Sequence, residues 1–287
     1  MSDQLVTPID LWEENTEGAF QIPAAKYFAA PGVSNSMLKH LRPTPAHLVA
    51  YLSEPRDPSP EMILGTLTHQ LILTPEQPLP NLAVKPRDMK FTTTEGKAWR
   101  TQAEAGGKTI ITSTDYDALY GMTKSVSRHP FAAEALGEGS LAEVSLFSRS
   151  GGLSRTMRKA RLDIVPAGNC LGDVKTTTDA SPSHFAKQMI EFGYACQAAH
   201  YLDLWNDLFP ESPRTEFVFW AVEKAPPYLC ACYYVGKESL TWARQVNSGR
   251  LALYDRCVET GVWPGYPDAP QPLEIPGWAF RTDILDQ

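Results

Sequence analysis

The sequence lacks the features that mark a membrane or secreted protein. None of its 287 residues belongs to a run near the roughly 18 apolar residues that a membrane-spanning helix needs. The acidic start, MSDQLVTPIDLWEENTEG, lacks the basic and apolar regions of a secretory signal peptide. We therefore expect a cytoplasmic protein without a membrane partner.

Cysteine and positive charge are also scarce. The 5 cysteines form no CxxC pair and are scattered through apolar segments, which predicts reduced thiols rather than disulfides. The formal net charge is −7, so the surface as a whole does not favour nucleic acid. A polyanionic partner would have to be met by a local basic groove.

Internal repeats and low-complexity tracts are absent as well. Hydrophobic residues make up 43% of the chain and charged residues 21%, which is typical of a globular protein. The weak periodicity of residues 1–30 predicts an N-terminal surface segment, and we expect residues 31–287 to form a single domain.

Helix and strand signals follow one another in an order typical of an α/β fold. Residues 34–52 predict two short helices, and residues 59–73 predict a longer helix capped by Ser59. Residues 76–108 predict a loop, because they are rich in Pro, Lys, Thr and Gly. The later elements are a helix at 114–127, strands at 141–148, 156–165 and 170–176, a helical pair at 182–208, strands at 215–223 and 228–235, and a helix at 238–259. We predict a central mixed sheet flanked by helices.

The stretch RLDIVPAGNCLGDVK places charges where a strand pair should face inward. With the turn centred on residue 168, Asp163 lies opposite Asp173, at a Cβ separation of about 4.5–5.5 Å, and Lys175 shares their face. Facing carboxylates repel unless a cation lies between them, and Mg²⁺ or Mn²⁺ suits such oxygen ligands. An exposed hairpin whose charges meet water explains the same pattern, and a register slip of one residue would break the pairing.

Further polar residues lie on neighbouring elements. Glu143 belongs to the strand LAEVSLF, and His69 to the helix GTLTHQLIL, where Gly65 one turn earlier allows close backbone approach. Gln197 and Tyr201, in QAAHY, share one helix face through their i, i+4 spacing. Taken singly, each is also typical of an ordinary core or amphipathic position.

Together these motifs carry a family resemblance. GTLTH, RLD, DVK and QAAHY, in this order, resemble the RecB-type branch of the PD-(D/E)xK nucleases. The chain is more similar still to the RecE-like group, the nuclease domain of exodeoxyribonuclease VIII, through VSNSMLKHL, AEVSLF, LGDVKTTTDASPSHFAK, FGYACQAAHYLDL, EKAPPY and WPGY. The likeness spans about residues 32–280 and implies a restriction-endonuclease-like core with a helical N-terminal elaboration. Asp173 stands where a Glu is common, and the cysteine cluster of the related iron–sulfur nucleases is absent.

The resemblance implies a role for each candidate residue. The metal ligands implied are Asp163, Asp173, His69 and the carbonyl of Val174. Lys175 would orient the attacking water or stabilise the transition state, and Glu143 would suit a second ion. Gln197 and Tyr201 would position the DNA strand.

A basic stretch precedes the first aspartate. In SRTMRKARLD, strand parity puts Lys159 and Arg161 on the face of Asp163, so we hypothesise that both contact phosphates beside the cut. A solvated strand rim is the alternative explanation of these charges.

The function implied is a metal-dependent exodeoxyribonuclease that uses Mg²⁺ or Mn²⁺. No GxxxxGK[ST] motif occurs, so we expect no ATP-driven motor. By resemblance, the enzyme degrades linear double-stranded DNA 5′→3′, leaves single-stranded tails for recombination and forms a homo-oligomeric ring. The resemblance also implies that the enzyme has a phage or prophage origin in a bacterial host and works with a single-strand annealing protein. The alternatives are an endonuclease on the same core and a non-catalytic DNA-binding module.

Overall fold

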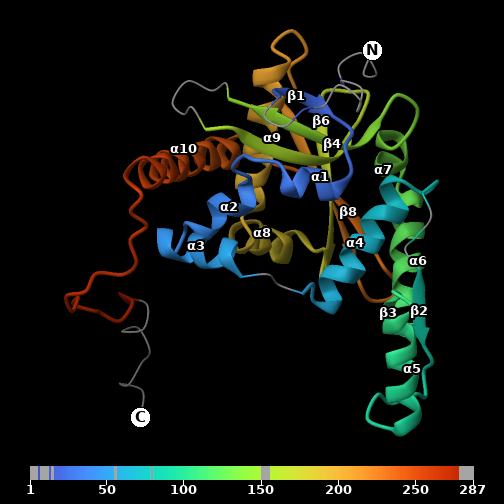
Figure 1. The fold of residues 1–287 in the computed structure, drawn as a ribbon. Coiled ribbons are helices and arrows are strands. Elements are labelled where there is room, and N and C mark those ends of the chain that lie inside the picture. Colours follow the sequence, from blue (N-terminus) through green and yellow to red (C-terminus); the bar gives the residue numbers. More distant parts are fainter. Residues whose placement is uncertain are drawn as a thin grey trace, which may run out of the picture.

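A six-stranded mixed sheet runs through the centre of the protein (Figure 1). The structure, a computed structural model, describes residues 6, 13, 16–54, 57–77, 79, 81–149 and 156–277. The strands, in spatial order, are β1 (Gly18–Phe20), β4 (Leu141–Ser148), β5 (Arg158–Val165), β6 (Cys170–Thr177), β7 (Glu216–Glu223) and β8 (Cys230–Tyr234). Strands β6 and β7 are parallel, and the other neighbours are antiparallel. The predicted α/β class with a mixed sheet is confirmed.

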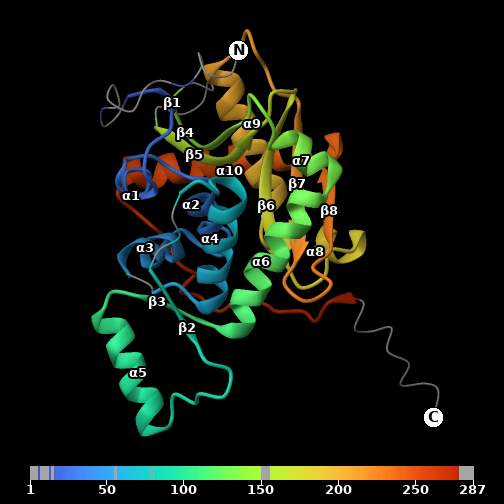
Figure 2. The same cartoon turned by 90° about the vertical axis from the view of Figure 1, so that its right-hand side faces the viewer.

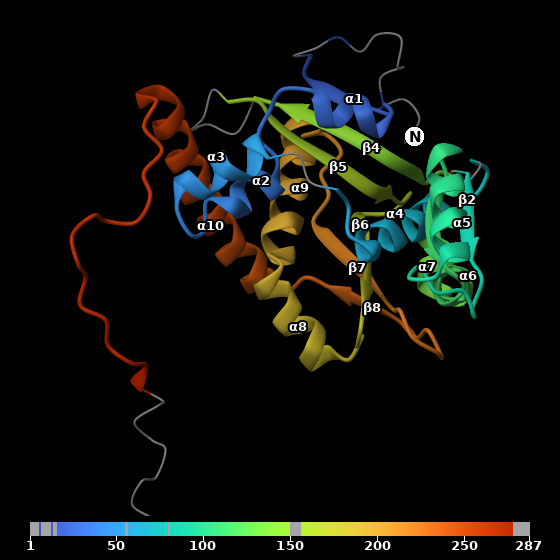
Figure 3. The ribbon, with the colours of Figure 1, turned by 60° about the horizontal axis from the view of Figure 1, so that its bottom comes forward.

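Helices cover both faces of this sheet (Figure 3). One face carries α8 (Pro182–Glu191), α9 (Tyr194–Leu208) and α10 (Lys237–Thr260); the other carries α4 (Pro60–Leu73), α6 (Ser113–Arg128) and α7 (Pro130–Ala135). Two clusters of buried side chains result. The α9 cluster includes Leu171, Phe217, Phe219, Phe185, Leu202 and Trp205. The α6 cluster includes Val174, Val218, Trp220, Leu64, Leu119 and Met122. Short helices α2 (Asn35–His40) and α3 (Pro45–Ser53) lie near one end of α10.

Part of the N-terminal segment belongs to the core rather than the surface. Strand β1 pairs with β4, and α1 (Ala24–Ala29) follows it. Phe20 and Ile22 are buried together with Tyr27 and Phe147. The expected surface segment is therefore wrong for residues 18–30, because a three-residue strand is too short to show a period in sequence. Residues 1–5, 7–12, 14 and 15 lie outside the described residues.

The predicted loop at residues 76–108 is also wrong in its centre. Strands β2 (Leu82–Lys85) and β3 (Thr109–Thr112) pair in parallel, and α5 (Thr94–Ala105) connects them. We call residues 81–112 the arm; it projects away from the central sheet (Figure 2). The hydroxyl of Thr93 caps α5, and a Cβ on Gly96 would lie 2.0 Å from the carbonyl oxygen of Lys90. Four-residue strands and a mostly polar helix give little hydrophobic pattern, which is why the sequence resembled a loop.

The alternation of faces changes within the β4–β5 pair. Leu162 belongs to the α9 cluster and Ile164 to the α6 cluster, although alternate residues of a regular strand share a face. Val144 and Ala142 on β4 are divided in the same way. Between them Glu143 adopts the left-handed backbone conformation, with φ 58°. A count of alternate residues therefore cannot be carried across this point of the sheet.

None of the described helices combines the length and apolar character needed to cross a membrane. All five cysteines are unpaired thiols, as the sequence predicted.

Helix α9 buries a histidine against the sheet. His200 is 3% exposed, and its Nε2 donates a hydrogen bond to the carbonyl oxygen of Lys159 at 3.1 Å. Burial lowers the pKa of His200 to about 4. The folded protein therefore holds this imidazole neutral at pH values where an unfolded chain protonates it.

We expect His200 to make folding sensitive to mild acid. Since its folded pKa lies below the unfolded value of about 6.5, its contribution is present above that pH and is lost as the pH falls toward 4. The difference in unfolding free energy between wild type and His200→Gln should shrink by about 3 kcal/mol between pH 7.5 and pH 4. Urea titrations of both proteins measure it, and a pH-independent difference would contradict the prediction.

Candidate active site

The two aspartates face each other across neighbouring strands. Ile164 pairs with Gly172, so Asp163 lies opposite Asp173, and the predicted hairpin register is confirmed. A Cβ on Gly172 would lie 2.2 Å from the Trp220 ring, so the tryptophan side chain of β7 packs directly over this glycine. The position before Asp173 therefore has no room for a side chain.

Strands β5 and β6 separate at this point. Their ladder pairing is confined to Ile164 and Gly172. Beyond it, the amide N–H of Val174 donates to Asp163 Oδ2 at 2.8 Å instead of to a backbone carbonyl. Because the N–H and C=O of a strand residue point to the same side, the Val174 carbonyl also faces β5, where it was expected as a ligand. The gap between the strands lets side chains of helices on both faces of the sheet reach the two aspartates.

Three side chains from different elements complete the cluster. His69, on α4, places Nδ1 3.2 Å from Asp163 Oδ2. Gln197, on α9, donates from Nε2 to Asp173 Oδ1 at 2.5 Å. Lys175 forms an ion pair with Asp173 Oδ2. Five of the residues singled out in the sequence therefore meet in one place.

These charged groups shift one another's pKa values. Burial acts to raise the pKa of Asp163, but the charge and hydrogen bond of His69 outweigh it, and the pKa is lowered. Burial, and then the charge of Asp163, raise the pKa of Asp173 to about 6. Burial acts to lower the pKa values of His69 and Lys175, but the facing carboxylates outweigh it and raise both. Lys175, an ammonium group paired with Asp173, is suited to stabilise negative charge on a phosphate.

An aromatic wall surrounds the Lys175 ammonium, and the sequence reading missed it. Nζ lies 4.9 Å from the ring centroid of Tyr194 and 5.8 Å from that of Phe219. These rings hold the cation in place through cation–π attraction. Tyr194 had a detectable signal: it precedes Gln197 by three residues and Tyr201 by seven, so all three lie on one face of α9.

Glu143 lies at the same level of the sheet but pairs with a different cation. It forms an ion pair with Arg161, whose Nη1 also donates to the Ile22 carbonyl oxygen at 2.7 Å and to Ser145 Oγ at 3.0 Å. Burial raises the pKa of Glu143, and the positive charge of Arg161 opposes the rise. Arg161 thus balances Glu143 and holds the segment after β1 against β5, which leaves it less available for phosphate than we expected.

Lys159 has a structural role that the sequence did not reveal. It is 6% exposed, and Nζ donates to the carbonyl oxygens of Tyr27 at 3.1 Å, Phe28 at 3.3 Å and Ala30 at 2.5 Å. All three ammonium donors are used at the C-terminal end of α1. The hypothesis that Lys159 contacts phosphate is therefore replaced by an anchoring role, because strand parity gave its direction but not what packs over it.

A cavity of about 1250 Å³ opens in front of the cluster. His69, Asp163, Glu143 and Tyr201 line it together with side chains of α1, α2 and α4. Burial raises the pKa of Tyr201, so its hydroxyl stays protonated and can donate to a bound group. Gly65 also lines the cavity, but a Cβ there would lie 3.9 Å from Thr176 Oγ1, so close approach does not require this glycine.

The donor set fits a divalent ion of the magnesium type. Two carboxylates and a backbone carbonyl are hard oxygen ligands, and His69 adds an imidazole nitrogen. Within the described residues, no three Asp, Glu, His or Cys side chains stand ready to hold an ion. His69 already pairs with Asp163, and Lys175 with Asp173, through the carboxylate oxygens that an ion would bind. Asp163, Asp173, the Val174 carbonyl and neutral His69 are the groups that would hold it.

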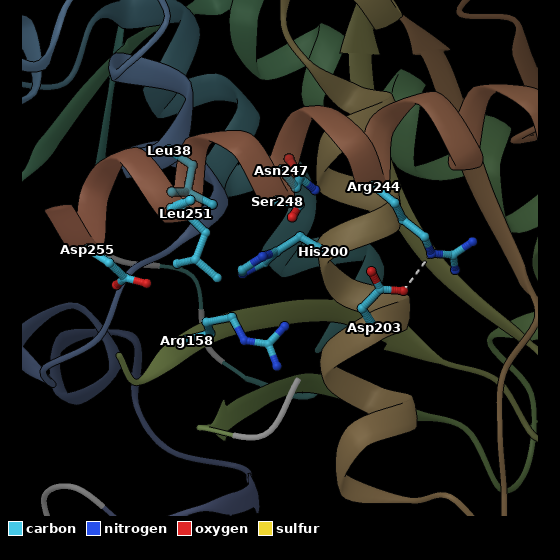
Figure 4. A pocket seen from close by; sticks show the side chains of 10 residues that line it. Leu38, Arg158, His200, Asp203, Arg244, Asn247, Ser248, Leu251 and Asp255 are labelled. Carbon is cyan, nitrogen blue, oxygen red and sulfur yellow. Dashed lines mark hydrogen bonds and ion pairs between the residues drawn. The ribbon is translucent and has the colours of Figure 1, made fainter. Parts of the chain in front are cut away.

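A second cavity, of about 130 Å³, lies between α9, α10 and β5 (Figure 4). Its charged side chains have partners within the protein: Arg244 pairs with Asp203, Arg158 pairs with Asp207, and Asp255 accepts a hydrogen bond from the Thr156 hydroxyl. None of the residues predicted for catalysis or metal binding lines it. The larger cavity is therefore the candidate active site.

Known proteins agree with this architecture. The model of one family, described as a PDDEXK-like domain of unknown function (DUF3799), matches residues 34–271. No curated protein matches the chain. The crystal structure of a "putative exonuclease" from Eubacterium rectale is similar, with a TM-score of 0.59 and 13% identity over 92% of this chain and 99% of that chain. The crystal structure of SSO0001 aligns over 66% of this chain and 86% of the SSO0001 chain at 13% identity, but the TM-score of 0.28 is too low to indicate a shared fold.

At such identities a structural likeness shows a shared fold alone. The family match carries more weight, since it covers well over half of the 287 residues and includes Asp163, Asp173 and Lys175. The chain therefore belongs to the PDDEXK-like family DUF3799, and the PD-(D/E)xK nuclease resemblance of its motifs is confirmed.

Proposed function

We propose that this protein is a divalent-metal-dependent deoxyribonuclease that hydrolyses phosphodiester bonds without ATP. One observation carries the proposal: Asp163, Asp173 and Lys175, from facing strands, meet His69 beside a cavity of about 1250 Å³. Facing buried carboxylates are costly to keep in a fold, as the raised pKa of Asp173 indicates, so their retention points to chemistry.

Each residue contributes a distinct part of the chemistry. A bound divalent ion supplies a more acidic water and neutralises charge on the phosphate. Asp163, Asp173 and His69 hold the ion, and Lys175 stabilises negative charge developing on the phosphate oxygens. Gln197 keeps Asp173 oriented, and Tyr201 offers its hydroxyl to the DNA strand. Glu143 borders the same cavity and suits a second ion.

We further infer an exonuclease that acts 5′→3′ on linear double-stranded DNA and leaves single-stranded tails for recombination. The RecE-like motifs support this choice, and the Eubacterium rectale protein of similar fold bears an exonuclease description. A ring of subunits around DNA would give processivity by topology, and a single-strand annealing protein would receive the tails. We infer a bacterial cytoplasmic setting and a phage or prophage origin on the same resemblance.

One gel tests the activity and its polarity. Linear duplex labelled at either end and closed circular DNA are incubated with the protein, with Mg²⁺, with Mn²⁺ and with EDTA. We expect loss of the linear duplex from its 5′ ends with either metal, no change in the circle, and no reaction in EDTA until metal is restored.

The same gel separates the alternatives. Nicking of the circle would identify an endonuclease on this core. Full activity in EDTA would contradict the metal requirement. Binding without cleavage under every condition would identify a DNA-binding module.

A further inference from the structure

We propose that the arm, residues 81–112, is a phosphate-binding surface that holds duplex DNA leading into the active-site cavity. The proposal rests on the nuclease function proposed above and names a contact surface for its substrate.

The arm is a basic segment of an acidic protein. It contains six Lys and Arg residues and three Asp and Glu residues, a net charge of +3, which leaves −10 on the rest of a chain whose total is −7. The basic residues are Lys85, Arg87, Lys90, Lys97, Arg100 and Lys108. A local positive surface on an otherwise acidic protein is where a polyanion binds.

Three of these cations are free to bind phosphate. Lys90, Lys97 and Lys108 are exposed, and within the part of the chain that the structure describes their side-chain ammonium groups have no hydrogen-bond or ion-pair partner. Arg87 and Arg100 pair with Asp117 and Glu104, but their side chains remain 72% and 56% exposed. Exposed pairs of this kind are weak and exchange readily for a phosphate.

The active-site cavity cannot supply these contacts with its own cations. Lys159 is used by three backbone carbonyls, and Arg161 is used by Glu143, Ser145 and Ile22. Since most protein–DNA affinity comes from phosphate contacts, the duplex needs cations outside the cavity.

The arm is built to hold its charges in place. Ala83 and Ile111 are buried, and the latter packs in the α6 cluster. Phe91 and Trp99 stack at 6.1 Å between ring centroids, and the loop before α5 lies too close to Gly96 for a Cβ. A polar surface loop without function would not need this internal core.

The arm follows a chain segment that lines the active-site cavity. Thr74, Glu76 and Gln77, which follow α4, line the cavity, and the arm begins four residues later, at Asn81. The twelve residues of α5 span about 18 Å, the rise of about five base pairs of B-DNA. The arm can therefore contact several phosphates of the duplex outside the cavity.

The test removes the three free charges. One variant, the arm variant, combines Lys90→Gln, Lys97→Gln and Lys108→Gln. A control of equal charge change combines Lys187→Gln, Lys237→Gln and Arg256→Gln, which are exposed positions on α8 and α10. Binding of a 30-base-pair duplex is measured in EDTA against salt concentration. Cleavage of the duplex and of thymidine 5′-(p-nitrophenyl phosphate), a small diester that reports the active site alone, is measured with Mg²⁺.

We expect the arm variant to bind at least about tenfold more weakly at 0.15 M salt, with a salt slope shallower by about 2 to 3, because each phosphate contact contributes about 0.9. Its cleavage of the small diester should equal that of wild type, and the control should match wild type throughout. An unchanged slope with intact cleavage overturns the arm proposal and leaves the nuclease function standing. An unchanged slope with an altered sedimentation coefficient also overturns it, by identifying a subunit contact. Failure of wild type to cleave either substrate overturns the proposed function itself.

Discussion

Asp173→Asn should reduce DNA cleavage by at least about 1000-fold while leaving the folded protein no less stable than wild type. The amide keeps the shape of the side chain and the partner for Gln197, but it removes the negative charge that a divalent ion needs. The pKa of Asp173, raised to about 6 by burial and by Asp163, means that the fold holds this charge unfavourably at neutral pH. Cleavage rates and melting temperatures of the two proteins check the prediction.

The matched control is Asp203→Asn on α9, whose carboxylate pairs with Arg244 at the smaller cavity. It should retain full activity. If Asp173→Asn cleaved DNA at the wild-type rate, Asp173 would not be a metal ligand. If it unfolded, its loss of activity would say nothing about chemistry.

Lys175→Met should lower turnover by about 100- to 1000-fold without weakening metal binding. The methionine fills the space beside Tyr194 and Phe219 but lacks the ammonium charge that stabilises phosphate oxygens. Because Lys175 pairs with Asp173 Oδ2, its removal takes away a competitor of the metal. Mn²⁺ affinity, measured by calorimetry, should therefore stay equal or rise while kcat falls.

Lys187→Met, at an exposed position of α8, is the control and should behave as wild type. A full rate in Lys175→Met would remove this lysine from the mechanism. A large loss of Mn²⁺ affinity would instead make Lys175 a group that positions Asp173.

Much of the candidate site could be predicted from the sequence. The turn at Pro166–Asn169 set the register that brings Asp163 opposite Asp173, because a hairpin turn determines which residues face each other. Helical spacing placed Gln197 and Tyr201 on one face of α9, and the structure shows that Gln197 on this face binds Asp173. The remaining assignments of metal and DNA contacts are predictions that await the experiments above.

The errors have a common cause in packing between distant segments. Lys159 was assigned to phosphate, but its ammonium is covered by α1, which lies about 130 residues earlier in the chain. Strand parity also fails across Glu143, whose left-handed conformation changes the faces of β4. Neither event leaves a periodic pattern in the sequence.

The order of strands and helices from β4 onward, the hairpin register and the facing of Asp163 and Asp173 followed from the sequence by itself, because turns, caps and hydrophobic periods act over a few neighbouring residues. Which cations remain available to a polyanion was decided only by the tertiary structure. Burial and pairing depend on what packs over a side chain, so Lys159 and Arg161 are used inside the protein while Lys90, Lys97 and Lys108 stay exposed on the arm.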